Sequence, residues 1–401
     1  MPAFYKEWFW KTKRSLMAKV LLKPQPRALV FMGENSTSDL CANVARFGLK
    51  HVLLVTDKPL VELGVTDRAV NALQSQGVQT TIYDGVLPDP TQQVVDDGLA
   101  LLRQSGCDAV MAFGGGSSID AAKVIALAAG NDCQAADCIG MNQCERPGLP
   151  FFAVPTTAGT GSEGTFIAVI SDNETHQKGG VIGNALIPRA AALDPLVMQG
   201  LPPHITAATG MDALTHAIES YIGVWETEDT NFYGLAACRL IFDNLERACS
   251  NGDDLEARQA MALASYYGGL AITNALVGYV HAISHNLGAK YGIPHGLGNA
   301  MVLPHVLEKM KSAAAPKMAE ISVHCGLGDS AEGDDALAQK LIDRVWALNE
   351  AIHIPRTTDK IQAGDIDDLL DLALAEGSGY PTPRFLERAE AEEFLNTLRV
   401  A

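Results

Sequence analysis

Two pairs of side chains in the second half of the sequence have types and spacings that suit a metal ion. Asp212 and His216 lie four residues apart, and His281 and His285 repeat that spacing further along the chain. Residues i and i+4 of a helix share one face, so each pair can direct two ligand atoms to the same side. One carboxylate with several imidazoles suits Fe(II) or Zn(II). A single such pair is often accidental, but both in one chain indicate a metal site.

Another histidine follows the second pair after a turn. Gly292 and Pro294 are expected to end the helix that carries His281 and His285, so that the chain returns with His295. Spacing alone leaves both His281 and His285 available as ligands.

Composition limits the class of protein. The chain has 401 residues, enough for about two domains, and its 47% hydrophobic and 19% charged residues predict a globular fold. The net charge of -17 argues against a nucleic-acid partner, because a polyanion would be repelled. The sequence contains no run of eighteen apolar residues, so we expect no membrane span.

Eight cysteines are present, and none forms a CxxC pair. Cys133, Cys138 and Cys144 are grouped loosely, which is compatible with a metal or redox site or with ordinary reduced thiols. Their spacing fits no common zinc pattern, so reduced thiols are the simpler interpretation. With no secretory signal apparent, we predict a cytoplasmic protein.

The first 27 residues are basic and aromatic, with seven Lys or Arg against one Glu. The spacing of their apolar residues fits an amphipathic helix, with the pairs Phe4/Trp8, Tyr5/Phe9, Leu16/Val20 and Met17/Leu21. Such a helix can lie on a membrane surface. We favour packing on the protein's own body or on a sister subunit.

The order of the predicted elements divides the chain in two. Apolar runs predict strands at 28–32, 51–56, 78–83, 109–113 and 150–155, and helical patterns lie between several of them. This βαβ rhythm predicts an α/β domain with a doubly wound, mostly parallel sheet that binds ligands at the carboxyl ends of its strands. Beyond Pro202 and Pro203 helical spacing dominates, which predicts an all-α helical domain. We therefore expect domains at 1–202, including an N-terminal helical extension over 1–27, and at 203–401.

A glycine-rich loop follows the strand predicted at 109–113. Gly114, Gly115 and Gly116 would let the backbone approach an anion, and the amides of Ser117 and Ser118 would begin a helix with its positive end outward. The alternative is a simple tight turn. The loop does not match the GxGxxG fingerprint.

Two other segments follow predicted strands. Asp57 can accept a hydrogen bond from a ribose hydroxyl, and its charge would repel a 2′-phosphate and favour NAD over NADP. It can equally be a helix N-cap or a turn residue. The segment 156–163 (TTAGTGSE) is rich in hydroxyls and glycines, and it suits either an anion or a capped turn.

Taken together and in order, these pieces resemble the iron-dependent (group III) alcohol dehydrogenase family. The resemblance covers most of the chain up to about residue 310. It is carried by TDK at 56–58, PDPT at 88–91, GGGS at 114–117 with Asp120, TTAGT at 156–160, DP at 194–195, ATGMDALTHA at 208–217, GYVH at 278–281, His285, PHG at 294–296 and LPH at 303–305.

The resemblance implies what spacing left open. The fold would be similar to that of dehydroquinate synthase, and the protein would be a homodimer. The metal, Fe(II) or Zn(II), would be held by Asp212, His216, His281 and His295, with His285 as a proton relay near the nicotinamide. NAD would be bound by Asp57, Asp89, Gly114, Gly115, Gly116, Ser117, Ser118, Asp120, Thr156, Thr157, Thr160, Thr165 and Lys178. Asp89 stands where many relatives have Asn, which makes that position a departure from the family pattern.

The activity implied is metal-assisted hydride transfer between NAD(H) and a small primary alcohol or diol and its aldehyde, and we expect the site in a cleft between the two domains. One alternative is a hydroxyacid–oxoacid transhydrogenase, in which the nicotinamide stays bound. Another is a metal lyase similar to dehydroquinate synthase, which would need a basic pocket for a phosphorylated acid. Residues 204–300 contain only four Lys or Arg, none beside the ligand motifs, which disfavours the lyase.

Overall fold

The computed structural model describes residues 3–144, 146–175 and 177–400, without the side chains of residues 3–8 and 20. The expected pairs Phe4/Trp8, Tyr5/Phe9 and Leu16/Val20 therefore include side chains outside the described part. The chain forms two compact units. The sheet unit comprises residues 25–201 and 253–269, and the helical unit comprises residues 1–24, 202–252 and 270–401.

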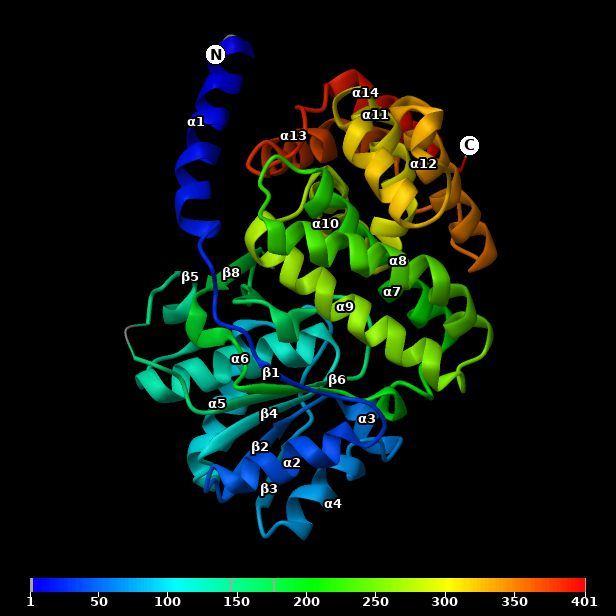
Figure 1. Ribbon diagram of the computed structural model, residues 1–401. Coiled ribbons are helices and arrows are strands. Elements are labelled where there is room, and N and C mark those ends of the chain that lie inside the picture. Colours follow the sequence, from blue (N-terminus) through cyan, green and yellow to red (C-terminus); the bar gives the residue numbers. More distant parts are fainter. Residues whose placement is uncertain (1–2, 145, 176, 401) are drawn as a thin grey trace. The chain divides into compact units, whose positions relative to one another are not determined.

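The sheet unit is built on six parallel strands in the order β1-β9-β6-β4-β2-β3. Their bounds are β1 Leu29–Met32, β2 His51–Val55, β3 Gln79–Tyr83, β4 Ala109–Gly114, β6 Phe151–Pro155 and β9 Ala190–Leu193. A smaller sheet, ordered β5-β8-β7, joins β5 Gly140–Met141, β8 Lys178–Ile182 and β7 Ile167–Ser171. Helices α5 (Gln92–Ser105) and α6 (Gly116–Asn131) pack together, as do α2 (Ser36–Arg46) and α4 (Asp67–Ser75), and Figure 1 shows the two pairs on opposite faces of the larger sheet. The predicted doubly wound sheet is confirmed.

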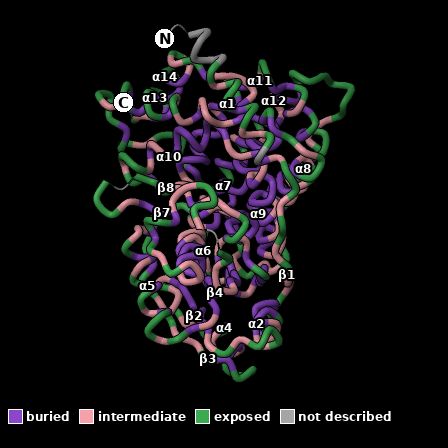
Figure 2. The backbone as a smooth tube through the Cα atoms, turned by 90° about the vertical axis from the view of Figure 1, so that its left-hand side faces the viewer, coloured by how far each residue is buried: buried purple, intermediate pink, exposed green. Residues whose placement is uncertain are grey.

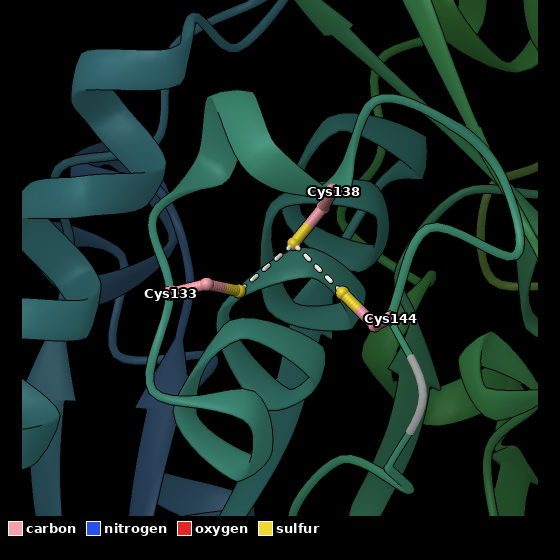
Figure 3. A group of neighbouring side chains, drawn as sticks. All are labelled: Cys133, Cys138 and Cys144. Atoms are coloured by element: carbon pink, nitrogen blue, oxygen red, sulfur yellow. Dashed lines mark hydrogen bonds between the residues drawn. The ribbon is translucent and has the colours of Figure 1, made fainter.

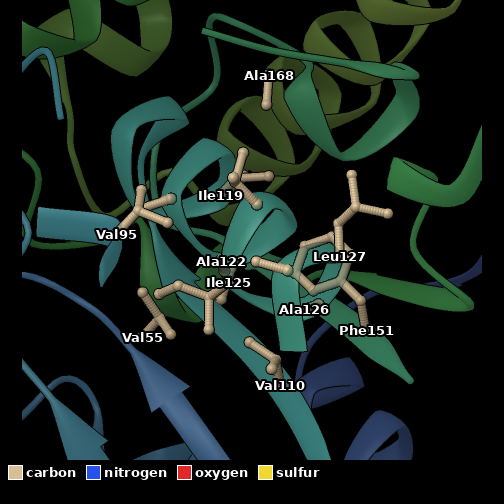
Figure 4. Packing of buried hydrophobic residues seen from close by; sticks show 14 of the residues in the cluster. Val55, Val95, Val110, Ile119, Ala122, Ile125, Ala126, Leu127, Phe151 and Ala168 are labelled. Carbon is tan, nitrogen blue, oxygen red and sulfur yellow. The ribbon is translucent and has the colours of Figure 1, made fainter. Parts of the chain in front are cut away.

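The core of the sheet unit lies around α6 and β4. Every residue of β4 is buried, and α6 buries ten residues over its sixteen-residue length, so neither element shows a polar face. Figure 4 shows Ile119 and Ile125 of α6 among Val55, Val110 and Phe151 of three neighbouring strands, and both elements belong to the buried part of the tube in Figure 2. Burial on all sides explains why this strand reads as one continuous apolar run.

Several elements of the sheet unit have weak sequence signals. Strand β9 has the sequence AAAL, and β8 has the sequence KGGVI. Alanine and glycine have low strand propensity, so the pairing of these segments depends on tertiary packing. Helix α2 was not expected from the sequence either, although it buries Leu40 and Val44 completely.

The helical unit consists of α1, α7, α8, the end of α9, and α10 to α14. Their bounds are α1 Ala3–Leu21, α7 Pro203–Ile222, α8 Glu228–Ser250, α9 Leu255–Ala275, α10 Tyr279–Tyr291, α11 His295–His324, α12 Asp334–Ala351, α13 Ile366–Gly377 and α14 Arg388–Thr397. The sheet unit also holds the short α3, Lys58–Glu62. The mostly helical character predicted for the second half of the chain is confirmed.

Helix α11 is longer than the 298–311 segment that its sequence pattern predicts. It continues through two internal prolines, Pro304 and Pro316. Proline removes a backbone donor and usually bends or ends a helix, but α11 packs along α7 and α12 and buries sixteen of its residues. This packing stabilises a helix that propensity alone would have interrupted.

Helix α1 packs on its own unit through a buried arginine. The Arg14 guanidinium donates hydrogen bonds to the Ser378 carbonyl and the Thr382 hydroxyl, both at 3.1 Å, and stacks over Phe385. Asn274 donates to the Leu21 and Lys23 carbonyls at the end of the helix. In the described part of the chain, no single helix has the length and apolar character needed to cross a membrane; α9 and α10 have them only as a pair, which is bent by 104°.

Candidate functional site

Three histidine side chains of the helical unit converge on one carboxylate oxygen of Asp212. Helix α7 provides Asp212 and His216, α10 provides His281, and His295 is the first residue of α11. The Nε2 atoms of His216, His281 and His295 lie 3.8, 3.7 and 3.3 Å from Asp212 Oδ1. One carboxylate and three imidazoles directed to a common point are a donor set that fits Fe(II) or Zn(II).

Local backbone conformation explains how His295 reaches this cluster. Gly292 caps α10 with φ of 62°, in the left-handed region that glycine adopts readily. Pro294 then stands at the N-cap of α11, so His295 lies in the first turn of the next helix. The turn expected from Gly292 and Pro294 is thus present.

Burial leaves the cluster one open side. The side chains of Asp212, His216 and His281 are 4%, 6% and 3% exposed, whereas that of His295 is 34% exposed. A metal held here would therefore meet solvent or a small ligand from the side of His295, as an open catalytic site requires.

Glu219 fixes the orientation of His281. Its Oε2 lies 2.6 Å from His281 Nδ1, and its two oxygens also accept hydrogen bonds from the Gly278 and Val280 amides, each at 2.8 Å. The carboxylate is thus held by two backbone groups at the start of α10. Because Nδ1 is bonded to Glu219, Nε2 of His281 is directed at Asp212, which is the usual way an outer carboxylate orients a ligating histidine.

Asn299 lies in the middle of the cluster. Its Nδ2 is 2.7 Å from Asp212 Oδ1, 3.3 Å from His281 Nε2 and 3.2 Å from His295 Nε2. The amide therefore approaches the same lone pairs that a cation would take. Asn299 stands four residues after His295, on the same face of α11.

The electrostatics of the cluster favour positive charge. Burial alone would lower the pKa of His281, but hydrogen bonds to Asp212 and Glu219 raise it to about 9. Burial opposes ionisation of Asp212, yet the neighbouring His216 and His295 hold its pKa well below the ordinary value. Two buried carboxylates therefore attract a proton or a metal ion to this point.

His285 stands beside the cluster with a carboxylate of its own. Its ring stacks on His295 at 5.1 Å, and its Nδ1 lies 2.7 Å from Glu376 Oε1. Glu376 also accepts a hydrogen bond from the Tyr380 hydroxyl at 2.8 Å. Burial lowers the pKa of His285, although the bond to Glu376 acts against this. Burial therefore favours the neutral form of the His285 ring over the charged form.

In the sheet unit, the candidate cofactor residues follow the carboxyl ends of three adjacent strands. Asp57 comes just after β2, Gly114 ends β4, and Thr156 follows β6. The chain goes from β2 outward to β3 and then crosses back to β4, so the strand order reverses between β2 and β4. In doubly wound sheets ligands bind outside the carboxyl ends at such a point.

The two glycine-containing loops pack closely on each other. A Cβ on Gly116 would lie 2.6 Å from Thr160 Cγ2, so the residue must be glycine for this approach. A Cβ on Gly115 would meet only Thr157, at 3.4 Å. Gly116, Ser117 and Ser118 form the first turn of α6, where backbone amides have no acceptor within the helix.

Several predicted cofactor residues also have bonds within the protein. Asp57 is the N-cap of α3 and accepts a 3.0 Å hydrogen bond from the Leu60 amide, so the capping alternative raised by the sequence is present. Asp120 accepts hydrogen bonds from the Ser162 hydroxyl at 2.6 Å and the Val169 amide at 2.9 Å. These contacts hold the loop 156–163 and β7 against α6.

Thr165, Lys178 and Asp89 have defined partners as well. The Thr165 hydroxyl lies 2.9 Å from the buried Lys123 ammonium, which also donates to the carbonyls of Thr165 and Ile167. Lys178 and Asp89 form a 2.7 Å ion pair. Asp89 adopts φ of 53°, a left-handed conformation that Asp and Asn tolerate.

Comparison with known proteins identifies the family. Residues 26–195 match the family described as iron-containing alcohol dehydrogenase, and residues 206–398 match the C-terminal part described as Fe-containing alcohol dehydrogenase family. The chain belongs to the iron-containing alcohol dehydrogenase family.

Relatives of this iron-type alcohol dehydrogenase include several enzymes of small alcohols. It is 37% identical to the NAD-dependent methanol dehydrogenase of Bacillus methanolicus, over 81% of this chain and 85% of that protein. It is 36% identical to the lactaldehyde reductase of Escherichia coli, over 92% of this chain and 97% of that protein. The solved structure of a 1,3-propanediol oxidoreductase matches with a TM-score of 0.89 and 36% identity, over 93% and 99% of the two chains.

Sequence reasoning missed several residues that surround the candidate metal site in this iron-type alcohol dehydrogenase. Glu219 follows His216 by three residues on α7, and Asn299 follows His295 by four on α11, so helical spacing offered a signal for both. Glu376 gave no such signal, because it lies 91 residues from His285 and is brought there by packing of α13 on α10.

Proposed function

We propose that the protein is an NAD(H)-dependent, metal-dependent oxidoreductase that interconverts a small primary alcohol or diol and its aldehyde. The observation that carries this proposal is the convergence of three imidazole Nε2 atoms on Asp212 Oδ1, in a chain of the iron-containing alcohol dehydrogenase family. A buried carboxylate with three imidazole nitrogen donors and one open side is the arrangement that Lewis-acid catalysis needs.

Asp212, His216, His281 and His295 would hold the metal, with Fe(II) as the expected ion and Zn(II) also compatible with the donor set. A metal bound there would polarise the carbonyl oxygen or lower the pKa of the alcohol hydroxyl. Glu219 keeps His281 Nε2 directed inward through its 2.6 Å bond to Nδ1. Asn299 would turn its amide away from the shared lone pairs or hold a ligand beside them.

His285 is assigned the proton transfer. With Nδ1–H donated to the Glu376 carboxylate, its Nε2 keeps a lone pair for the proton that an alcohol releases. Glu376 is itself held by the hydroxyl of Tyr380 and the amide of Asn286, so the imidazole has a fixed tautomer and orientation.

The cofactor is assigned to the carboxyl edge of the six-stranded sheet. The amides at the start of α6 would receive the pyrophosphate of NAD, and the hydroxyls of Thr156, Thr157 and Thr160 line the loop packed against them. One carboxylate oxygen of Asp57 accepts the hydrogen bond that caps α3, and the other would accept hydrogen bonds from the ribose hydroxyls. Its charge favours NAD over NADP.

The substrate class is supported by the names of three relatives, which refer to methanol, lactaldehyde and 1,3-propanediol. The experiment is to purify the chain anaerobically, load Fe(II) or Zn(II), and follow NADH with a panel of short alcohols, diols and aldehydes. Metal-dependent turnover is expected with NADH and much less with NADPH. Turnover of a hydroxyacid with an oxoacid without added NAD would instead identify a transhydrogenase. Bound metal without any redox turnover would favour the lyase.

A homodimer in the cytoplasm is part of the same proposal. Sedimentation of the purified chain tests the assembly, and fractionation of the native cells tests the compartment.

A further inference from the structure

Three cysteines of the sheet unit gather at one point that the proposed reaction does not use. Cys133 follows the C-cap of α6, Cys138 ends the short helix η1 (Ala135–Cys138), and Cys144 lies in the loop after β5. Cys138 Sγ lies 3.7 Å from Cys133 Sγ and 3.6 Å from Cys144 Sγ. Figure 3 shows the Cys138 thiol pointing between the other two.

The three sulfurs have the separation of ligands around one small metal ion. A metal bound at about 2.3 Å holds tetrahedral sulfur ligands about 3.8 Å apart and trigonal ones about 4.0 Å apart. All three sulfurs of this cluster lie within 4.8 Å of one another. These separations are far from the sulfur–sulfur bond of a disulfide, which is about 2.0 Å. The thiols are therefore reduced and converge on a shared centre.

The surroundings of the three thiols favour a cation. The carboxyl end of α6 meets the cluster, because the Cys133 amide donates to the Ala128 carbonyl at 3.3 Å and the Cys133 thiol lies 3.9 Å from the same oxygen. The Cys138 thiol lies 3.5 Å from the Gln134 carbonyl. Helix carboxyl ends carry partial negative charge, and carbonyl oxygens favour positive charge near them.

Access to the cluster is open on one side. Cys138 is 1% exposed and forms part of the core of the sheet unit, whereas Cys133 and Cys144 are only partly buried at its edge. A cation can thus arrive from solvent, bind between the two outer thiols, and reach the buried third. A water molecule would complete four-coordination, as in other sites with three protein ligands.

We propose that Cys133, Cys138 and Cys144 form a second metal site, which takes a thiophilic divalent cation of the Zn(II) type. Thiolate ligands select such soft or borderline ions, whereas the Asp and His ligands of the helical unit also accept Fe(II). Binding releases the thiol protons to solvent and makes three metal–sulfur bonds without any change of oxidation state. The site ties the end of α6 to η1 and to the loop after β5.

The test uses the reduced enzyme loaded with Fe(II), and Cd(II) is the probe. Thiolate-bound Cd(II) gives a charge-transfer absorption in the near ultraviolet that carboxylate and imidazole ligands do not give, so the signal separates this site from the one at Asp212. We expect the absorption to saturate at one Cd(II) per chain, and prior addition of Zn(II) to suppress it.

Variants decide whether the three cysteines carry the signal. Cys133→Ser and Cys144→Ser, at partly exposed positions, should each weaken Cd(II) binding at least about tenfold, and Cys138→Ala should abolish the saturable absorption. Cys249→Ser, at a partly buried cysteine of α8, is the matched control and should leave the absorption unchanged. The same saturable absorption in Cys133→Ser and Cys144→Ser would overturn the proposal. So would recovery of the three residues from the untreated protein as a disulfide pair with a remaining thiol.

Discussion

The two candidate sites of this chain are built from different parts of the polypeptide. The candidate metal site in the helical unit consists of ionisable side chains, with Asp212 and Glu219 buried at 4% exposure each. The candidate dinucleotide site in the sheet unit consists of glycines, helix-start amides and hydroxyls after three parallel strands. We call the candidate metal site the side-chain site and the candidate dinucleotide site the backbone site. Binding at the side-chain site should be lost when a functional group is removed, whereas binding at the backbone site should be lost when an atom is added. Substitutions that shorten a side chain should therefore weaken the first site, and substitutions that enlarge one should weaken the second.

The largest effect is expected from removal of the central carboxylate. In a chain whose cysteines 133, 138 and 144 are replaced by serine, Asp212→Ala deletes the oxygen on which three imidazoles converge, so metal content should fall to background. Turnover should drop at least about a thousandfold, because a Lewis acid contributes several kcal/mol to the barrier. Metal analysis and NADH turnover measure both. Asp243→Ala, at an exposed acid on α8, is the control, and full metal content in Asp212→Ala would refute the ligand assignment.

A smaller effect should follow when a ligand keeps its place but loses its support. Glu219→Gln removes the charge that orients His281 while keeping the size of the side chain, so metal affinity should fall about 10- to 100-fold. Competition with a chelator of known affinity measures this change, and Glu246→Gln on the exposed side of α8 controls for the lost charge. Equal affinity of Glu219→Gln and the parent would mean that packing alone orients His281.

The backbone site should respond to an added methyl group. Gly116→Ala places a Cβ 2.6 Å from Thr160 Cγ2, so the Thr160 side chain or its loop must shift. Overpacking of this kind costs about 1–3 kcal/mol, so the KM for NADH should rise about tenfold or more. Gly200→Ala, where no atom lies within 4 Å of the new Cβ, should leave the KM unchanged. Metal affinity should be unchanged in both variants. A change in metal affinity would mean that the two sites do not respond to substitution independently.

The smallest expected effect concerns Lys123 of α6, the one lysine that is buried among the described residues. Burial lowers the pKa of Lys123 to about 8, although Asp120 and Glu163 act to raise it. In the unfolded chain the pKa returns to about 10.4. Between these values the unfolded state binds more protons, so this group makes stability rise with pH.

Lys123→Met removes that contribution. Denaturant unfolding at about pH 8 and about pH 10 should show the difference as a less positive stability slope in the variant than in the parent. Identical slopes would mean that the pKa of Lys123 is the same in the folded and the unfolded chain, contrary to the expected effect of burial.

The two regions also differ in how much of their structure could be predicted from the sequence. Strands β2, β4 and β6, which precede the loops of the dinucleotide site, could be predicted because they are short apolar runs buried on both faces. The bends at Gly292 and Pro294 were readable because glycine and proline have strong backbone preferences. In contrast, β8 and β9 carry glycine and alanine, and only their neighbours make them strands.

For the metal site, i to i+4 spacing found the pairs Asp212/His216 and His281/His285 but did not decide between His281 and His285 as ligands. That choice depends on which imidazole faces Asp212 in three dimensions, and His281 lies 3.7 Å from its Oδ1. Glu376 could not be predicted from the sequence, because it contacts His285 from a different helix and lies 91 residues further along the chain. The cysteine cluster was judged by spacing in the sequence, while its Sγ atoms meet through the fold of η1 and its flanking loops.

The most direct test of the central claim is anaerobic reconstitution. The purified chain is stripped of metal with a chelator, titrated with Fe(II), and assayed for NADH-dependent aldehyde reduction at each step, with the three cysteines 133, 138 and 144 replaced by serine so that only one site remains. The account predicts activity that is near zero without metal, rises in proportion to added Fe(II), and saturates at one ion per chain. Full activity in the stripped protein, or none at saturation with any divalent metal, would contradict it.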